Sequence, residues 1–413
     1  MQNRIVSKYL IFIVLTYLLM GEKPLGAQHL EFVHHHDDSV RHVFSITMDD
    51  NQLTEIHRPM VVKIDISASD FIYNGKKYVL EEIELHGQTT LEFRRKSYTI
   101  SLDKKMSFRT KEGYYKFKNF YLISMSMDKN YFRNSLSFHL LNELGLFELV
   151  HDYVNLIING KNEGVFLLLQ RPQDWALKRI DSPYIIRRDY GKGIDKEKYS
   201  KDLSEESVVN YRNQFKLIYQ YAEKYKGKAL YRKLNKVLDL KEYYKWLAFN
   251  YWLMNGDYTD ELYLYIDPET DIFRPLPWDY DDIFSVTPHE GNTKRLRPLN
   301  NDFMFSIQEP LDRYLIQDNY CYERYKETLY TVMKSISSES LGKEIEMIYS
   351  ELYPYYNAVD IIGQTRYDKY DKTDLNALET EMTLRYGFMI ERRRDILENL
   401  GGQLSKKFLA NHK

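Results

Sequence analysis

The sequence predicts an α+β protein with a β-rich N-terminal lobe and a mainly helical C-terminal lobe. From His42 to Leu102, short runs rich in β-branched and aromatic residues alternate with turn signals, which is typical of strands. From Glu309 to the end, apolar residues recur at helical spacing. The chain has 413 residues, of which 43% are hydrophobic and 15% aromatic, and this is enough for a large packed core.

The first 27 residues have the pattern of a secretory signal peptide. A basic start precedes an apolar run from Tyr9 to Met20, and the small pair Gly26-Ala27 follows. An apolar run of 12 residues is too short to span a bilayer comfortably. We therefore expect cleavage after Ala27 and an exported protein, whether periplasmic, surface-attached or secreted, with an uncleaved anchor as the alternative. Residues 28–41, which include His34 to His36, are expected to form a flexible mature N-terminus.

The charge of the chain gives no sign of a nucleic-acid or membrane partner, and its cysteine content excludes an internal disulfide. The formal net charge is only −2, so the sequence predicts neither nucleic acid nor a membrane surface as a partner. Cys321 is the only cysteine, which excludes an internal disulfide. Its helical context predicts a buried small residue rather than a nucleophile.

The N-terminal lobe is predicted to contain strands, one helix and a buried hairpin. The predicted strands are Val43–Met48, Met60–Ile66, Lys77–His86 and Ser97–Leu102. Asn74-Gly75 is a strong signal for a hairpin turn. Asp128 to Gly145 is predicted as a helix capped by Asp128, because apolar residues recur every four positions. Asp152 to Gln170 is predicted as a central hairpin around Asn159-Gly160, since both of its faces are apolar.

The strand around Lys96 carries a candidate anion-binding pocket. The period of two places Lys96 on the same face as Tyr98 and Ile100, so its side chain points with the apolar side. A lysine aimed there either reaches the strand edge or meets a negative partner in a cleft. Arg94 and the loop from His86 to Thr90 are close in sequence and support the pocket, while an edge lysine is the alternative.

The C-terminal lobe begins with a polar, Tyr-rich segment that we expect on the substrate side. It is predicted to hold a helix near Val208–Lys226 and a basic loop at Arg187–Lys198. Asp239 and Glu242 form a capping box before the next helix, which ends at Asn255-Gly256-Asp257. A helix that ends in a tight glycine turn can hold a catalytic carboxylate rigidly, so Asp257 is a candidate catalytic residue.

Two carboxylate clusters lie between Asn255 and Phe284. The clusters consist of Asp257, Asp260 and Glu261, and of Asp279, Asp281 and Asp282. Between them, Leu262–Ile266 and Ile272–Leu276 alternate like strands, so a hairpin should return the second cluster beside the first. Adjacent carboxylates repel unless a cation lies between them, and oxygen ligands suit Mg²⁺, Mn²⁺ or Ca²⁺ rather than zinc. A solvated acidic turn is the alternative interpretation.

The last part of the chain is predicted as helices that pack and present a charged surface. Arg392 to Arg394 are expected on a solvated helix face. The predicted division is a signal peptide at 1–27, the mature N-terminus at 28–41, a β-rich lobe at 42–175, a lobe with the catalytic and metal loops at 176–340, and a helical extension at 341–413.

Five motifs, taken in order, resemble the CotH family of spore-coat-type atypical protein kinases. They are an HG…T…KSY strand at His86–Tyr98, a D…FRN helix start at Asp128–Asn134, DYVNLIING…GVFLL at Asp152–Leu168, an N-x-D loop followed by YLY at Asn255–Tyr265, and PWDYD at Pro277–Asp281. The resemblance covers about His42 to Phe284 and, more loosely, the C-terminal helices.

The resemblance implies a bilobal, kinase-like fold with ATP bound between the lobes. It implies that Lys96 pairs with the ATP phosphates, that Asp257 orients the acceptor hydroxyl or accepts its proton, and that Asp279 holds Mg²⁺ or Mn²⁺. Phosphoryl transfer needs these groups, and the acceptor implied is a Ser/Thr hydroxyl of a protein. A nucleotide- or partner-binding pseudokinase scaffold is the second hypothesis, and a metal-dependent hydrolase is the third.

The chain departs from the family pattern at two positions. Gln170 stands where the family usually carries a glutamate, so its link to Lys96 is at best a hydrogen bond. Glu261 stands where the catalytic loop normally supplies an asparagine, and glutamate binds a metal with a different charge and geometry. Glu261 and Asp281 are therefore expected to join Asp279 as metal ligands, with Arg94 and Gln170 near the nucleotide.

Overall fold

A computed structural model of the chain describes most of its residues after the N-terminal segment. The described residues are 30, 32, 42–60, 66, 68–111, 113–288, 303–306, 308–372 and 374–410. The predicted signal peptide, the histidines at 34–36 and most of the predicted strand Met60–Ile66 lie outside them. Residues Phe32–Lys413 form one unit.

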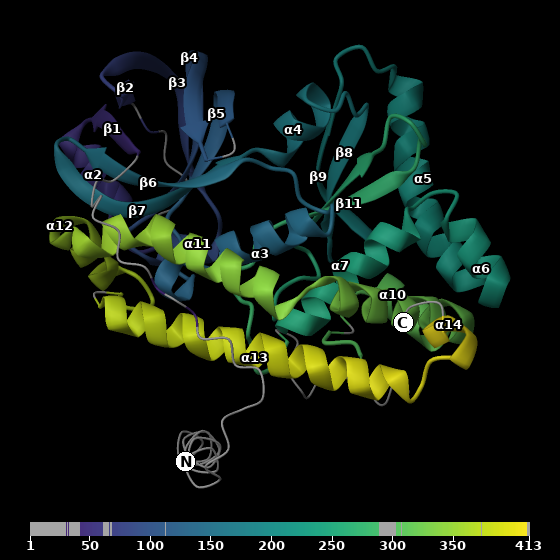
Figure 1. The fold of residues 1–413 in the computed structure, drawn as a ribbon. Coiled ribbons are helices and arrows are strands. Elements are labelled where there is room, and N and C mark those ends of the chain that lie inside the picture. Colours follow the sequence, from purple (N-terminus) through teal and green to yellow (C-terminus); the bar gives the residue numbers. More distant parts are fainter. Residues whose placement is uncertain are drawn as a thin grey trace, which may run out of the picture. The chain divides into compact units, whose positions relative to one another are not determined.

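Seven strands of the N-terminal part close into a barrel, in the order β1-β2-β3-β4-β5-β7-β6 (Figure 1). They are β1 (Val43–Met48), β2 (Ala68–Tyr73), β3 (Lys76–His86), β4 (Ser97–Thr110), β5 (Gly113–Ile123), β6 (His151–Ile158) and β7 (Lys161–Gln170). Neighbouring strands pair antiparallel except β1 and β6, which pair in parallel. Alternate side chains such as Phe44, Phe71 and Phe120 fill the interior. The β-rich part is therefore confirmed, but its closure was not predicted.

Two tight turns of the barrel follow the Asn-Gly signals in the sequence. Asn74 and Gly75 have φ of 51° and 70°, and Asn159 and Gly160 have φ of 50° and 73°. Both pairs lie in the left-handed region, which suits a two-residue hairpin turn. The second turn joins β6 to β7, and since each of these strands also pairs with another strand, the predicted central hairpin is confirmed.

Helix α3 (Arg133–Glu143) begins later than its apolar pattern predicted. Asn130 and Tyr131 have φ of 60° and 65°, so the helical hydrogen-bond ladder cannot run through them. A short turn, η2 (Lys129–Tyr131), precedes the helix instead. Asp128 still caps it, because its carboxylate accepts hydrogen bonds from the backbone N–H groups of Arg133 at 3.1 Å and Asn134 at 3.0 Å.

A second sheet has the strand order β11-β10-β8-β9. Its strands are β8 (Tyr184–Asp189), β9 (Gly193–Tyr199), β10 (Leu262–Ile266) and β11 (Phe273–Pro277). The hairpin of β10 and β11 is confirmed, and β10 has the predicted bounds. The prediction of a loop at Arg187–Lys198 is wrong, because these residues form most of the β8–β9 hairpin. In this hairpin Arg187 pairs with Lys196. Their charge concealed the strand pattern, since a basic side chain on a sheet face needs a partner that is distant in sequence.

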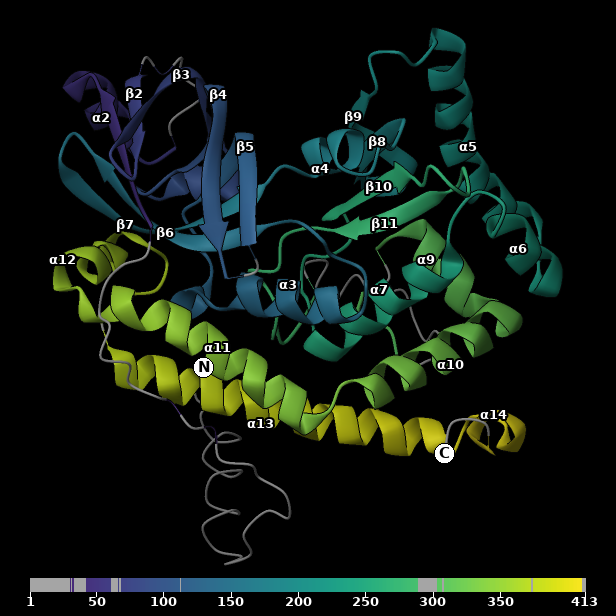
Figure 2. The same ribbon diagram turned by 45° about the horizontal axis from the view of Figure 1, so that its top comes forward.

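Helices surround this sheet and run beneath the barrel (Figure 2). The longer ones are α5 (Glu205–Lys224), α7 (Leu240–Leu253), α10 (Asn319–Ser335), α11 (Ser338–Asn357) and α13 (Leu375–Gly401), and the shorter ones are α2 (Asp50–Ile56), α4 (Pro172–Lys178), α6 (Gly227–Leu234), α9 (Pro310–Gln317), α12 (Val359–Ile362) and α14 (Lys406–Ala410). Helix α11 packs against both α3 and α13. Cys321 is buried in α10, as predicted. Within the described part of the chain, no helix combines the length and apolar character needed to cross a bilayer.

The arginine run on α13 is only partly a solvated face. Arg392 donates to the carbonyls of Tyr251 and Trp252, both at 2.9 Å, in the last turn of α7. Arg393 donates to the carbonyl of Met333, and Arg394 remains exposed. A guanidinium at a helix C-terminus satisfies orphan carbonyls, so Arg392 supports the end of α7.

Candidate active site

A cavity of about 600 Å³ opens between the barrel, α3 and the carboxyl end of α7. Its walls include the loop after β3, the end of β8, and both predicted acidic clusters. The charged and amide side chains around this site include Arg133, Asn134, Arg187, Arg188, Asp257, Asp260, Glu261, Asp279, Asp281, Asp282 and Lys369. The predicted loop from His86 to Thr90 also lines the cavity.

The β10–β11 hairpin brings the two acidic clusters together, as its length predicted. Leu262 pairs with Pro277 at the open end of the hairpin. One residue beyond that pair, the backbone N–H of Trp278 donates to the carbonyl of Glu261 at 3.1 Å. Trp278 and Phe284 are both buried and bracket the second cluster. The second cluster therefore rests on a packed base.

Backbone hydrogen bonds join the end of α7 to the loop that follows β11. The N–H of Gly256 donates to the carbonyl of Asp282 at 3.0 Å, and the N–H of Phe284 donates to the carbonyl of Leu253 at 2.8 Å. A Cβ at Gly256 would lie 2.0 Å from Oδ2 of Asp282 and 2.9 Å from Oγ of Ser285, so a larger residue there would require these side chains to shift. Asp257 and Asp279 are thus carried by two loops that cannot move independently.

Asn134 at the start of α3 orients the second acidic loop. Its Oδ1 accepts a hydrogen bond from the backbone N–H of Tyr280 at 2.8 Å. Its side chain also hydrogen-bonds to Asp279, and this contact opposes the rise in the pKa of that carboxyl. Asp279 has φ of 45°, a strained conformation for a residue with a side chain. The D…FRN motif was the only sequence signal for this role, because position on a helix face alone could not identify the partner.

Burial and mutual repulsion raise the pKa values of three acids in the cavity. Burial is the largest cause for each of them. It acts with the charge of Asp257 to raise the pKa of Asp279 to about 6. The pKa values of Glu261 and Asp281 are raised well above their usual range, and in both cases the Asp279 charge adds to burial. A cation among these carboxylates would remove that repulsion.

The donor set fits a hard divalent cation, although the carboxylates do not form a closed cage. Oε1 of Glu261 accepts from Arg187 at 2.8 Å, while its buried Oε2 accepts no hydrogen bond from the described residues. Within those residues, no group of three or more His, Cys, Asp or Glu side chains is already placed to hold a metal ion. Oxygen-only ligands with an unsatisfied carboxylate oxygen are suited to Mg²⁺ or Mn²⁺.

Lys96, Arg94 and Gln170 are not among the described residues that line the cavity. Lys96 is buried, and its Nζ donates to the carbonyls of Arg58 at 3.0 Å and Leu91 at 2.6 Å, and also contacts that of Phe93. These backbone acceptors take up the ammonium group. The predicted contact of Lys96 with ATP phosphates stays a prediction.

The other two predicted nucleotide-side residues also have partners elsewhere. The guanidinium of Arg94 lies over the ring of Tyr367, 4.0 Å from its centroid. Oε1 of Gln170 accepts from the backbone N–H of Val150 at 3.2 Å. In this conformation neither side chain joins Asp257 and Asp279 in the cavity.

Three arginines in the cavity wall bind acceptors of the protein itself. Arg133 donates to the carbonyl of Asp281 at 3.0 Å. Arg187 donates to Glu261, as described above. Arg188 is fully buried and donates to the carbonyl of Thr259 at 3.0 Å. The sequence did not identify Arg187 and Arg188 as site residues, because their partners become neighbours only when β8 pairs with β10.

Two joined loops that present carboxylates to one cavity, beside several cations, are the arrangement expected of a protein that handles phosphate with a divalent metal. The family model described as CotH kinase protein matches residues 83–389, and the chain belongs to this family. The inner spore coat protein H of Bacillus subtilis is 22% identical over 346 residues, which cover 77% of this chain and 87% of that protein.

Two solved structures show a lower similarity. The Helicobacter pylori proinflammatory kinase CtkA is 11% identical, with 67% of this chain and 94% of that chain covered and a TM-score of 0.28. The Shewanella oneidensis toxin–antitoxin complex of HipA, HipB and operator DNA gives 14% identity, 70% and 65% coverage, and a TM-score of 0.23. Structural likeness at this level does not define a fold.

Proposed function

We propose that this member of the CotH kinase family is an exported, metal-dependent protein kinase that transfers the γ-phosphoryl group of ATP to a Ser/Thr hydroxyl of a protein. In this proposal the lobes are the barrel with α3 and the second sheet with its helices, and ATP binds in the cavity between them. Export rests on the signal-peptide pattern of residues 1–27. The near-neutral charge argues against nucleic acid as the acceptor.

One observation carries the proposal: Asp257 and Asp279 lie on loops that backbone hydrogen bonds hold together at one cavity. Phosphoryl transfer depends mainly on positioning and on electrostatic stabilisation, so it requires carboxylates whose relative placement is fixed. The helix end stabilised by Arg392 fixes Asp257, and Asn134 fixes the loop of Asp279. A solvated acidic turn would need neither support.

The proposed roles follow from the two loops. Asp257 orients the acceptor hydroxyl and accepts its proton as the hydroxyl oxygen bonds to the γ-phosphorus. The bond from that phosphorus to the bridging oxygen breaks, and ADP leaves with the electron pair. Asp279, Asp281 and Glu261 would hold Mg²⁺ or Mn²⁺. The metal, when bound, neutralises charge on the phosphate oxygens. Arg187 orients Glu261 through its ion pair.

A pseudokinase scaffold is the second candidate, and the placement of Lys96 favours it. In a kinase of the implied type, Lys96 would contact phosphate, yet its ammonium is bound by backbone carbonyls outside the cavity lining. Gln170 and Glu261 replace the residues usual in the family. Binding of nucleotide without transfer would support the scaffold.

Calorimetric titration of the full chain with ATP and Mg²⁺ tests the assignment of the two acids. Asp279→Asn should lose the metal-dependent part of ATP binding, whereas Asp257→Asn should keep it and lose transfer. Asp202→Asn, which changes an exposed carboxylate outside the cavity lining, is the matched control. Metal-dependent ATP binding that is unchanged in Asp279→Asn would remove that residue from its role.

A further inference from the structure

Lys369 lines the cavity, and its ammonium group has no hydrogen-bond acceptor among the described residues. The three arginines of the wall bind acceptors of the protein, and Lys96 binds carbonyls elsewhere. Lys369 is exposed and lines the cavity. Among the described residues its Nζ has no hydrogen bond or ion pair, and its recorded contact is with the ring of Tyr370, 5.5 Å from the centroid.

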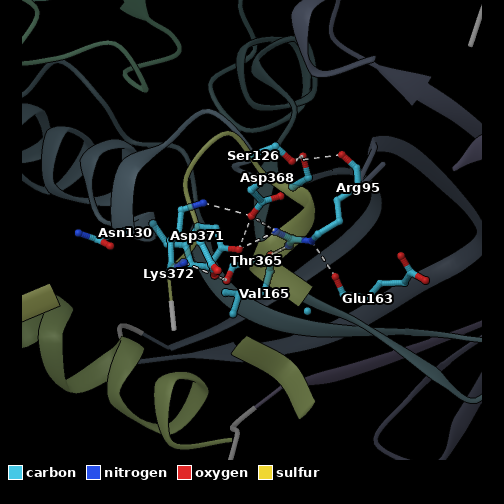
Figure 3. A network of polar contacts seen from close by, with 12 residues as sticks. Arg95, Ser126, Asn130, Glu163, Val165, Thr365, Asp368, Asp371 and Lys372 are labelled. Carbon is cyan, nitrogen blue, oxygen red and sulfur yellow. Dashed lines mark hydrogen bonds and ion pairs between the residues drawn. The ribbon is translucent and has the colours of Figure 1, made fainter. Parts of the chain in front are cut away.

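Lys369 belongs to a short segment, Thr365–Lys372, which we call the strap. The strap begins within η4 (Gly363–Tyr367) and ends before α13, far along the chain from the barrel. Figure 3 shows Asp368 of the strap beside Arg95, which comes from the residues before β4. One oxygen of Asp368 accepts from Arg95 Nη1 at 2.6 Å, from the Tyr131 hydroxyl at 2.6 Å and from Lys372 Nζ at 3.1 Å. A buried carboxylate thus ties the strap to the barrel.

Further contacts fix the conformation of the strap at the position of Lys369. The backbone N–H of Lys369 donates to the carbonyl of Ser126 at 3.0 Å. The hydroxyl of Thr365 donates to Asp371 at 2.9 Å and accepts from the N–H of Lys372 at 3.0 Å. The backbone of Lys369 is therefore fixed on both sides, while its side chain is left free to reach into the cavity.

The buried ions of the strap are better explained by positioning than by stability. The side chains of Asp368 and Lys372 are both 0% exposed, and that of Arg95 is 1% exposed. Ion pairs this deeply buried add little net stability, because desolvation offsets their attraction, but they demand one geometry. The geometry here holds Lys369 in the wall of a cavity that several carboxylates also line.

We propose that Lys369 contacts the phosphate groups of the bound nucleotide and supplies the charge that the family resemblance assigns to Lys96. This inference rests on the proposed function and names a further residue of the same site. A lysine provides phosphate with a compact charge and several donors, which suits a flexible side chain on a fixed backbone. Eight acids line the cavity: Asp189, Asp195, Asp257, Asp260, Glu261, Asp279, Asp281 and Asp282. A polyphosphate therefore needs an uncommitted cation there.

The test compares binding of ATP with Mg²⁺ and binding of adenosine, which lacks phosphate, to the full chain. Lys369→Ala should weaken ATP binding about tenfold or more and leave adenosine binding unchanged. Lys369→Arg keeps the charge and should restore most of the affinity for ATP. Lys201→Ala, an exposed lysine outside the cavity lining, is the control. Lys96→Met tests the rival assignment in the same assay.

The outcomes separate the inference from the proposed function. If the wild-type chain binds ATP and Lys369→Ala binds it equally well, the inference fails while the proposed function stands. If ATP binding is lost only in Lys96→Met, then Lys96 contacts the phosphates and Lys369 does not. An equal loss of ATP and adenosine binding in Lys369→Ala would show a general disturbance and also overturn the inference. A wild-type chain that binds no ATP overturns both.

Discussion

Asn134 and Tyr280 are 146 positions apart, yet Oδ1 of Asn134 accepts a hydrogen bond of 2.8 Å from the backbone N–H of Tyr280. Asn134 belongs to the first turn of α3, whose backbone N–H groups are capped by Asp128. Tyr280 lies between two acids of the cavity. The start of one helix therefore sets the conformation of the loop that we propose to hold the metal.

Replacing Asn134 with alanine should release the second acidic loop. The variant leaves a buried backbone N–H without its acceptor, which costs about 1–3 kcal/mol of unfolding free energy. Because Asp279 loses its support, we also expect metal-dependent ATP binding to weaken at least tenfold. Urea denaturation and calorimetric titration measure the two effects. Asn142→Ala, on an exposed position of the same helix, should change neither, and equal effects of both variants would contradict the role of Asn134.

Gly256→Ala should disturb the site more than the fold. The added Cβ would meet Oδ2 of Asp282 at 2.0 Å and the side chain of Ser285 at 2.9 Å, so the Asp282 carboxylate must shift within the cavity. We expect a loss of about 1–3 kcal/mol of stability and of most ATP binding. Gly387→Ala is a matched control, since a Cβ there meets no atom within 4 Å and a helical alanine should add up to about 1 kcal/mol. Normal ATP binding by Gly256→Ala would contradict the tight apposition of the two loops.

Protonation of His86 should lower the stability of the folded protein at acidic pH. The ring centroid of His86 lies 4.2 Å from that of Tyr121. Burial, with the neighbouring cations Lys196 and Arg187, lowers the pKa of His86 to about 4. The unfolded chain therefore binds more protons between about pH 6.5 and 4, and the stability present above pH 6.5 is lost as the pH falls through this range.

The measurement is chemical denaturation of the wild type and His86→Asn at pH 7 and pH 4.5. Relative to the variant, the wild type should lose about 2 kcal/mol on this acidification. A stability difference that does not change with pH would show that His86 is not held neutral in the folded state.

Lys96→Met should destabilise the barrel, because the carbonyls of Arg58, Leu91 and Phe93 would lose a charged donor. The expected loss is about 2–3 kcal/mol of unfolding free energy. Lys105→Met, which changes an exposed lysine of the neighbouring strand β4, should stay within about 0.5 kcal/mol of the wild type. Equal stability of the two variants in urea would show that the carbonyl contacts of Lys96 contribute nothing.

Local patterns predicted the parts of the fold that local chemistry determines. The Asn-Gly turns, the span of β10 and the return of the second acidic cluster beside the first follow from turn chemistry and from period-two alternation. The same alternation predicted an apolar setting for Lys96, which is buried. It could not reveal the acceptors of Lys96, because these are backbone carbonyls, which look alike at every residue.

The remaining errors concern partners that are distant in sequence. The sequence predicts a loop at Arg187 and Arg188 because this segment is basic and contains glycine, yet the two arginines pair with Glu261 and the carbonyl of Thr259 once β8 joins β10. Arg392 was assigned to a solvated face because the carbonyls that it caps belong to α7. The strap could not be predicted, since its buried carboxylate contacts residues more than 200 positions away.

The most direct test of the central claim is transfer of labelled phosphate from γ-labelled ATP by the full chain with Mg²⁺ or Mn²⁺ to itself or to a generic protein acceptor. Asp257→Asn, Asp279→Asn and the control Asp202→Asn are measured beside the wild type. The account predicts acid-stable label on Ser or Thr with the wild type and the control, and none with the two cavity variants. Transfer that persists in both cavity variants, or its absence in a wild type that binds ATP, would contradict a kinase built on Asp257 and Asp279.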